Sequence, residues 1–328
     1  MARLFSSFFT RCAAGALTAL LLSSQAGAQP AWPSKPVRLV VPYAAGGTTD
    51  YAGRQVAQKL TELLGQSFFV ENKAGGSGTI GTQMVVRSAA DGATFLVNDT
   101  AYTMLPALFA KLPWNHATDL VPVTTLVQTP VILVVPSGSP FKTLQDFLAH
   151  ARQQPGKLNF GSGGTGSSAH LQVELFNKEA GISVTHVPYK GAGEAMLGLM
   201  AGQVDMLISA TPTAIPQVRS GKVRALAVTG NARLAALSDV PTFAEAGVKG
   251  YGVMNWFGLA APKGTPAPII ERMQKSVVQA LADPALRARL ADQGAQPGGM
   301  ASTEFAKLIR SETQQWTEAA RVAGIQPQ

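Results

Sequence analysis

Two glycine-rich turns contain the residues best suited to bind a ligand. The first is VPYAAGGTTD, residues 41–50, where Gly46 and Gly47 separate an apolar run from a helical pattern. The N-terminus of a helix presents free backbone N–H groups and a partial positive charge, and glycines let an anion approach the backbone closely. The turn therefore either binds an anion or is an ordinary strand-to-helix connection. Asp50 is better placed to cap the helix than to touch a ligand.

The second turn lies in LNFGSGGTGSSAHLQVELF, residues 158–176, and is unusually rich in small hydrogen-bond donors. A tight turn needs glycine, but it does not need four interleaved hydroxyls, so the pattern favours a ligand-binding loop. His170 follows in the first turns of the next helix, where it is either a base or a helix-packing histidine. The small residues of this turn are Gly161, Ser162, Gly163, Gly164, Thr165, Gly166, Ser167 and Ser168.

Few other residues suit catalysis or metal binding. No serine stands in GxSxG, and neither HExxH nor an EF-hand loop occurs. The single cysteine, Cys12, excludes a disulfide framework and a Cys-based zinc site. We therefore expect no metal and no enzymatic activity, and the alternative is an exported hydrolase that uses Ser167 or Ser168 with His170. The four histidines are His116, His150, His170 and His186.

The first 28 residues have the pattern of a secretory signal peptide. Arg3 and Arg11 supply a positive start, residues 12–22 are an apolar run, and Ala26-Gly27-Ala28 is a small-residue cleavage site. The apolar run is far too short to span a membrane as a mature helix. Cleavage after Ala28 leaves 300 residues (328 − 28) without cysteine, and we expect the mature protein to be exported.

Composition and charge narrow the function further. With 46% hydrophobic and 14% charged residues, the chain is typical of globular proteins, which excludes a disordered chain or a coiled coil. The net charge is +8 (27 − 19), or +6 (25 − 19) without Arg3 and Arg11. This excess could favour anionic partners, but the basic residues are not clustered, so nucleic acid is a poor fit.

Strands and helices alternate along the chain. VRLVV, residues 37–41, precedes a glycine turn and apolar residues at helical spacing, and the unit recurs at SFFV, ATFLV, PVILVVP, KLNFG, DMLIS and VRALAV. The pattern turns helical from Pro266. Such alternation predicts an α/β fold with mostly parallel sheets. A length of 328 residues suggests two domains, with crossings expected near residues 131–135 and 250–258.

A GxGxxG pattern formed by Gly76, Gly78 and Gly81 suggests a dinucleotide site only weakly. Asp99 lies 18 positions (99 − 81) beyond Gly81, which is loosely the spacing of a dinucleotide fingerprint. The preceding strand is short and is separated from the glycines by polar residues, and an exported protein rarely meets a nicotinamide pool. We therefore expect no dinucleotide and no other cofactor.

Seven motifs in order resemble the Bug family of extracytoplasmic solute receptors, which serve tripartite tricarboxylate transporters. They are WPSKPVRLVVPYAAGGTTD, VENKAGGSGTIG, GSGGTGSSAHL, HVPYKGAGEA, GKVRALAVTG, DVPTFAEAG and WFGLAAPKGTP. The resemblance runs from about Trp32 to the C-terminus. It implies a two-lobed periplasmic binding protein, type II-like, with the ligand cleft between lobe 1 (residues 29–130 and 251–328) and lobe 2 (residues 131–250).

The resemblance also implies what is bound and where. A monomer would capture a small organic carboxylate and deliver it to the integral membrane subunits of such a transporter. In the family the carboxylate meets the first strand-to-helix loop and the Gly/Ser-rich loop, often through backbone amides and water. The expected ligand-binding residues are Tyr43, Ala44, Gly46, Gly47, Thr48, Asn98, Ser162, Gly164, Thr165, Gly166, Ser167, Tyr189, Lys190, Gly191 and Asp205. The family usually has proline where this chain has Ala45 and Ala74, and its loss frees φ and loosens the loops.

Overall fold

The computed structural model describes residues 32–165, 167–189, 191–322 and 324–327. The predicted signal peptide, residues 1–28, lies outside them. All the described helices and strands lie within Lys35–Gln328, which forms one compact unit. None of these helices is both long enough and apolar enough for a membrane crossing.

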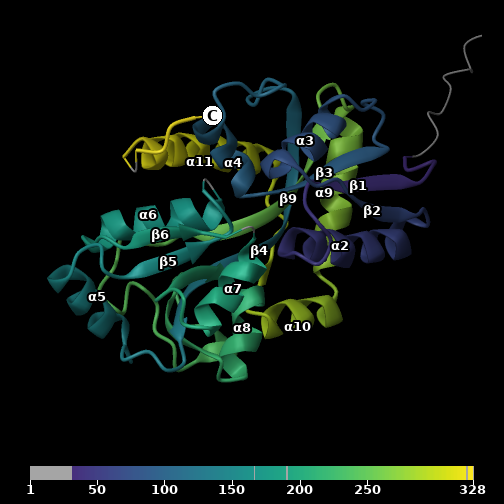
Figure 1. Ribbon diagram of the computed structural model, residues 1–328. Helices are drawn as coiled ribbons and strands as arrows, with labels where there is room; N and C mark the ends of the chain where they lie inside the picture. The colour runs from purple at the N-terminus through teal and green to yellow at the C-terminus, as the bar shows by residue number, and fades with distance from the viewer. Residues whose placement is uncertain (1–31, 166, 190, 323, 328) are drawn as a thin grey trace, which may run out of the picture. The chain divides into compact units, whose positions relative to one another are not determined.

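The first lobe is built on three parallel strands. β1 pairs with β2 on one side and with β3 on the other, and α2 and α3 lie on opposite faces of these strands (Figure 1). The elements are β1 (Val37–Val41), α2 (Thr48–Leu64), β2 (Phe68–Asn72), the 3-10 helix η1 (Gly76–Gly78), α3 (Thr79–Val86), β3 (Thr94–Asp99) and α4 (Ala101–Leu108).

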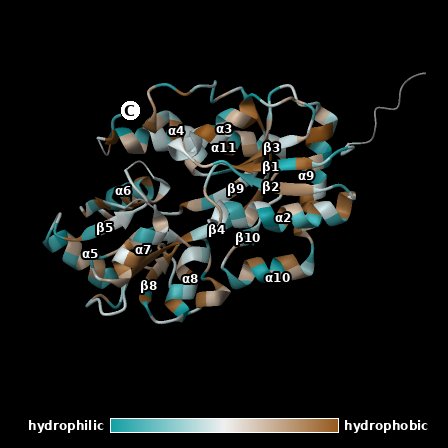
Figure 2. Ribbon diagram, turned by 45° about the vertical axis from the view of Figure 1, so that its right-hand side comes forward, coloured by the Kyte–Doolittle hydropathy of each residue, from teal (hydrophilic) through white to brown (hydrophobic). Residues whose placement is uncertain are grey.

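The sequence of these elements matches their surroundings. Four of the five β1 side chains are buried, because helices cover both faces of a parallel sheet and leave no polar face. In α2, Ala52, Val56 and Leu60 are buried at helical spacing and form the face that packs on the sheet. The helices around the sheets, such as α2 and α9, accordingly show both hydrophilic and hydrophobic residues (Figure 2).

Two long strands connect the lobes. β4 (Leu120–Pro136) pairs antiparallel with β9 (Met254–Pro262) as far as Pro130, and with β7 and β8 from Val131 onward. β9 also pairs antiparallel with β3. One eight-stranded sheet therefore continues from the first lobe into the second.

The second lobe again alternates strands and helices. β5 and β6 form a separate parallel pair, and an isolated bridge joins Phe160 of β5 to Met206, next to β7. The elements are α5 (Leu144–Gln153), β5 (Asn159–Ser162), α6 (Ser168–Ala180), β6 (Thr185–Pro188), α7 (Ala192–Met200), β7 (Leu207–Ala210), α8 (Thr211–Arg219), β8 (Val223–Val228) and the 3-10 helix η2 (Ala235–Leu237).

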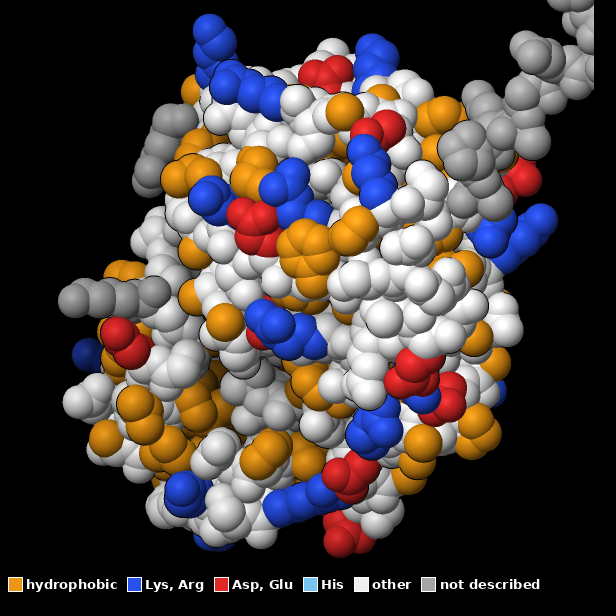
Figure 3. Space-filling model, turned by 90° about the vertical axis from the view of Figure 1, so that its right-hand side faces the viewer, with side chains coloured by type: hydrophobic (Ala, Val, Ile, Leu, Met, Phe, Trp, Pro, Cys, Tyr) orange, Lys and Arg blue, Asp and Glu red, His pale blue; other side chains and the backbone are white. Residues whose placement is uncertain are grey.

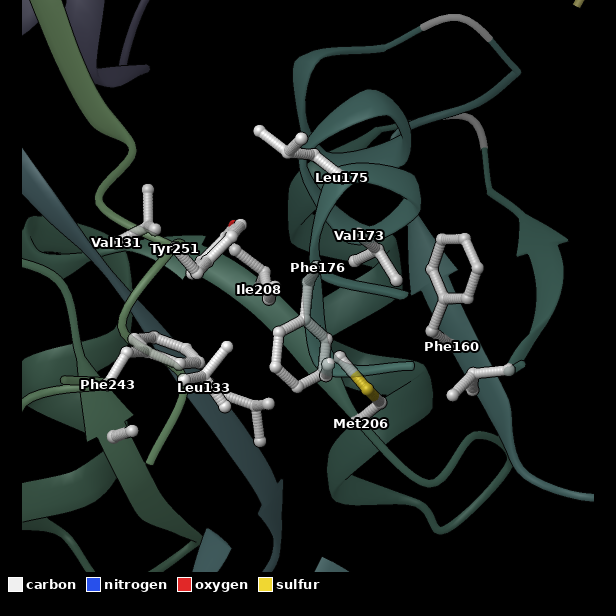
Figure 4. Close-up of a cluster of buried hydrophobic side chains, with 14 of the residues drawn as sticks. Val131, Leu133, Phe160, Val173, Leu175, Phe176, Met206, Ile208, Phe243 and Tyr251 are labelled. Atoms are coloured by element: carbon white, nitrogen blue, oxygen red, sulfur yellow. The ribbon is translucent and has the colours of Figure 1, made fainter. Parts of the chain in front are cut away.

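The core of the second lobe gathers around Phe176 of α6 (Figure 4). Its ring contacts Phe243 and Tyr251 edge-on, with centroid separations of 5.6 and 5.5 Å. Val131 and Leu133 of β4 belong to the same cluster. The long connecting strand is thus packed into this core along its second half.

The C-terminal helices return to the first lobe, and the last one contacts both cores. Phe305 of α11 packs edge-on against Trp256 of β9 at 4.9 Å, whereas Trp316 and Ala319, further along α11, belong to the cluster around Phe176. α11 therefore bridges the two lobes. The remaining elements are α9 (Ala267–Leu281), α10 (Pro284–Asp292), β10 (Gln296–Pro297) and α11 (Ser302–Val322).

The mixed α/β fold is as predicted, but the prediction of mostly parallel sheets is wrong. Within the described part of the chain, three strand pairs are parallel and five are antiparallel. All five antiparallel pairs involve β4 or β9. The apolar runs of β4 and β9 resemble those of buried parallel strands, because β4 and β9 are also covered on both faces. Burial alone does not reveal the direction of a strand.

Charged side chains are dispersed on the face shown in Figure 3. Lys and Arg side chains alternate there with acidic, apolar and neutral polar ones. On the surface of the described residues, several Lys and Arg side chains form ion pairs with acidic ones, as in Lys35–Asp91 and Arg233–Glu245. The net positive charge of the chain is therefore spread out rather than gathered on this face.

Candidate functional site

A cavity of about 230 Å³ lies where strand ends and helix starts from both lobes meet. The first lobe contributes residues after β1 and residues at and after the end of β3. The second lobe contributes residues of β7 and residues after β5, β6 and β7, and β9 contributes Asn255 and Phe257. The lining residues are Thr48, Thr49, Asp99, Thr100, Ala101, Ser168, Ala169, Gln172, Ala192, Ile208, Ser209, Ala210, Thr213, Asn255 and Phe257.

Five helices begin at this cavity. The first residues of α2, α4, α6 and α7 line it, as does Thr213 in the first turn of α8. The N-cap residues Gly47, Gly191 and Ala210 of α2, α7 and α8 provide no side-chain cap. The first N–H groups of a helix have no partner within it and carry partial positive charge. The cavity is therefore surrounded by backbone donors.

An amide pair connects the lobes at the cavity. Gln172 of α6 donates from Nε2 to Asn255 Oδ1 of β9 at 2.6 Å, and both side chains line the cavity. The bond orients each amide, so Asn255 Nδ2 remains as a donor and Gln172 Oε1 as an acceptor.

Asp99 is the one ionisable side chain among the described residues that line the cavity. Its two oxygens accept hydrogen bonds from Thr49 Oγ1 at 2.7 Å, Tyr43 OH at 3.0 Å and the backbone N–H of Ala101 at 3.0 Å. Burial raises the pKa of Asp99, and these three donors oppose that rise. The pKa of the Tyr43 phenol is raised by burial and by the adjacent carboxylate.

Known proteins are similar to this chain along most of its length. The model of a family described as "Tripartite tricarboxylate transporter family receptor" (TctC) matches residues 52–324. The chain belongs to this family. It is 34% identical over 295 residues to Protein BugT of Bordetella pertussis, covering 89% of this chain and 90% of that one.

Two solved structures of similar proteins hold carboxylates. "R. palustris Rpa4515 with adipate" is 36% identical with a TM-score of 0.83, over 90% of this chain and all of that one (100%). MatC from Rhodopseudomonas palustris "with bound malate" is 34% identical with a TM-score of 0.77, over 88% of this chain and 100% of that one. The TctC chain thus has the two-lobed fold of periplasmic solute receptors, and its role is that of a solute-binding receptor.

In the first loop of this TctC receptor, Thr48 lines the cavity, and Tyr43 reaches it through Asp99. Ala44, Gly46 and Gly47 are exposed just before α2. The Gly46 N–H donates to Asp50 Oδ2 at 3.0 Å. Asp50 is buried and holds the turn in place rather than facing the cavity.

In the Gly/Ser-rich loop, two of the three predicted hydroxyls, those of Ser162 and Ser167, form hydrogen bonds within the protein. Ser162 Oγ hydrogen-bonds to His186 Nε2 at 2.6 Å, and Ser167 is the N-cap of α6, accepting from the His170 N–H. The Gly164 N–H also donates to Ser162 Oγ. Thr165 is exposed, Gly166 lies outside the described residues, and Ser168 is the hydroxyl of this loop that lines the cavity.

None of the described residues predicted outside these two loops lines the cavity itself. Gly191 precedes the lining residue Ala192, whereas Tyr189 donates to Gln203. Asn98 is buried next to Asp99, and its amide atoms have no protein partner among the described residues. Asp205 accepts from the Asn159 N–H at 2.7 Å, at the start of β7, whereas the cavity lies at the end of that strand. Lys190 lies outside the described residues.

Several lining residues were missed from the sequence. Thr100 directly follows β3, Ser209 is the last residue but one of β7, and Thr213 lies three residues beyond β7. Ligand-binding residues of α/β proteins lie near such strand ends, so this signal was available. Gln172 and Asn255 had no such signal, since they are 83 positions apart and meet only through the fold.

The hydrolase alternative pairs Ser167 or Ser168 with His170, but the Ser167 hydroxyl accepts from the backbone N–H of His170 as the N-cap of α6. The side-chain hydrogen bond between a serine and a histidine in this loop joins Ser162 to His186 instead. The His170 ring is buried and stacks on His186, with centroids 3.8 Å apart and an angle of 11°. Burial, and secondarily His186, lower the pKa of His170 to about 4. His170 is thus a packed, neutral histidine in this receptor.

The GxGxxG pattern has a packing role. A Cβ atom at Gly81 would lie 2.8 Å from both the Lys73 carbonyl oxygen and Pro42 Cα, so glycine lets α3 approach the end of β1. Gly76 and Gly78 shape η1, where both have positive φ. The pattern therefore serves local geometry in this loop.

We expect His170 to destabilise the protein in mild acid. Its folded-state pKa of about 4 is below the value of about 6.5 in an unfolded chain. The unfolded chain therefore binds more protons, and the free energy of unfolding falls as the pH drops from 6.5 toward 4. At pH 4.5 the loss from this residue amounts to about 2–3 kcal/mol. Urea unfolding of the parent and of His170→Gln at pH 7.5 and 4.5 measures it. Equal losses in the two proteins would contradict the assignment.

Proposed function

We propose that this receptor captures a small organic carboxylate in the cavity and delivers it to the integral membrane subunits of a tripartite tricarboxylate-type transporter. The proposal rests on the convergence of five helix N-termini on a cavity whose described lining contains no Lys, Arg or His. Each N-terminus contributes about 0.3–2 kcal/mol toward an anion, and micromolar affinity needs about 8 kcal/mol. Several must therefore act together, which this arrangement allows.

The relatives support the ligand class. Rpa4515 and MatC, both similar along nearly the whole chain, were solved with adipate and with malate. In this chain the loop of Tyr43 to Thr48 and the loop of Ser162 to Ser168 would supply backbone donors, joined by Thr48 and Ser168 hydroxyls. The site binds its ligand and catalyses no reaction, and we propose that the receptor acts as a monomer.

A side chain that fills the cavity should abolish ligand-induced stabilisation. Ala169 lines the cavity at the start of α6, so Ala169→Leu occupies ligand space. Binding at a hundred times Kd stabilises a protein by about 2.7 kcal/mol, which raises the melting temperature by several degrees. A thermal-shift screen of adipate, malate, succinate, citrate and benzoate should show this rise for the parent and its loss for the variant.

The matched control is Ala288→Leu, which places the same change on the exposed face of α10 and should keep the full rise. Far-UV circular dichroism checks that both variants are folded. A folded Ala169→Leu variant that kept the ligand-induced rise would show that the carboxylate binds elsewhere.

We further propose that the lobes comprise residues 29–130 with 251–328, and residues 131–250, and that they close on the ligand. The change of partner along β4 between Pro130 and Val131, and the start of β9 at Met254, support these boundaries. The bond between Gln172 and Asn255 crosses the proposed boundary between the lobes.

Closure should be visible in solution. Small-angle X-ray scattering of the receptor saturated with the carboxylate identified by thermal shift should give a smaller radius of gyration than the ligand-free protein, because the lobes approach each other. An unchanged radius at saturation would contradict closure on binding.

We propose that residues 1–28 direct export to the periplasm and are removed. The Ala26-Gly27-Ala28 pattern supports cleavage before Gln29. N-terminal sequencing of the protein recovered from the periplasm should therefore begin at Gln29. Periplasmic protein that begins at Met1 would contradict cleavage.

A further inference from the structure

The charge inside the cavity does not match a plain carboxylate ligand. Five helix N-termini favour negative charge, yet the one ionisable side chain in the described lining is itself an acid, Asp99. A dicarboxylate placed next to an ionised Asp99 would meet like charge in a largely desolvated space, which is costly.

The hydrogen bonds around Asp99 favour its ionised form. The Ala101 N–H can only donate, so it requires a lone pair on Oδ1, and the Thr49 hydroxyl donates to Oδ2 at 2.7 Å. Tyr43 OH donates to Oδ1 as well. In the described part of the chain, no Lys, Arg or His forms an ion pair with Asp99. The carboxyl group is therefore held in place by its donors, and no cationic side chain among the described residues compensates a negative charge on it.

The position of Asp99 divides the cavity into two ends. By accepting from Ala101, Asp99 already occupies the N-terminus of α4. The starts of α2, α6, α7 and α8 remain for an anionic group. A ligand that pairs favourably with both ends has a negative group facing these helix starts and, a short distance away, a positive group facing Asp99.

We infer that the ligand is an amino acid whose ammonium group pairs with Asp99 while its carboxylate is held by the helix N-termini. This inference rests on the proposed function, since it specifies the carboxylate that the cavity takes. An ammonium group provides three donors, and pairing with it compensates the buried charge that otherwise raises the pKa of Asp99. Asp99 is then the residue that selects amino acids over their deamino counterparts.

Matched ligand pairs test the inference on the mature protein. Calorimetric titration compares each of the twenty common L-amino acids with its counterpart that lacks the α-amino group, for example aspartate with succinate and glutamate with glutarate. A charge-assisted contact of this kind corresponds to a preference of about 10- to 100-fold. In every pair of which at least one member binds, we expect the amino acid to bind more tightly by that factor.

Asp99→Asn is the matching variant, because it keeps the size of the side chain and removes its charge. It should lose most of the amino-acid preference, whereas the control Asp292→Asn, on the exposed surface of α10, should keep it. The comparison of pairs on the parent protein remains decisive if Asp99→Asn does not fold.

The outcomes are separable from those of the proposed function. If deamino carboxylates bind as tightly as their amino acids or tighter, the inference is overturned and the carboxylate receptor stands. If folded Asp99→Asn keeps the full preference, the assignment to Asp99 is overturned. If no member of any pair binds, the carboxylate cavity itself is refuted, and the inference with it.

Discussion

The shared strand β4 is the constraint on which the rest of the structure depends. Its first half pairs with β9 and its second half with β7 and β8, so one hydrogen-bonded sheet contains strands of both lobes. This continuity brings the carboxyl ends of β1 and β3 to the same gap as that of β7, and the bridge from Phe160 to Met206 places β5 beside β7. Ligands of α/β proteins bind at such strand ends. The cavity is therefore a consequence of the topology, and its lining of helix starts follows from the strand-to-helix order of the sequence.

The electrostatics of the cavity come mainly from the backbone. Hydroxyls that look available in the sequence are engaged locally: Ser162 with His186, and Ser167 as the cap of α6. These bonds fix the shape of the Gly/Ser-rich loop and leave the starts of the helices to face the cavity. Asp99 is the exception, a side-chain charge of opposite sign held by three donors. A site made of backbone dipoles and one carboxylate can distinguish ligands by where their charges lie.

The sequence predicted what local patterns determine. VRLVV followed by two glycines correctly predicted β1 and α2, and the density of small residues in 158–176 pointed to the loop that reaches the cavity through Ser168. Contacts between residues that are far apart in the sequence could not be predicted. The Ser162–His186 and Gln172–Asn255 bonds join residues 24 and 83 positions apart. No local pattern in either segment indicates which residue it will contact. Asp99 was considered only as part of a weak dinucleotide pattern, because its three donors come together only in the folded chain.

α11 contacts the cores of both lobes and would limit the closure that we propose. Near its start Phe305 packs on Trp256, and the Trp256 indole donates to the partly buried Glu312 at 2.7 Å. Further along, Trp316 and Ala319 are packed with Phe176 in the second lobe. The contacts of Trp256 with Phe305 and Glu312 lie within the first lobe, so a rotation of the lobes about β4 and β9 would leave them intact. Such a rotation would have to preserve or slide the packing of Trp316 and Ala319 in the second-lobe cluster, because opening it would expose a tryptophan. In the proposed closure the helix would restrict the lobes to a small rotation, and a small rotation would suffice, since the cavity is already lined by helix starts from both lobes.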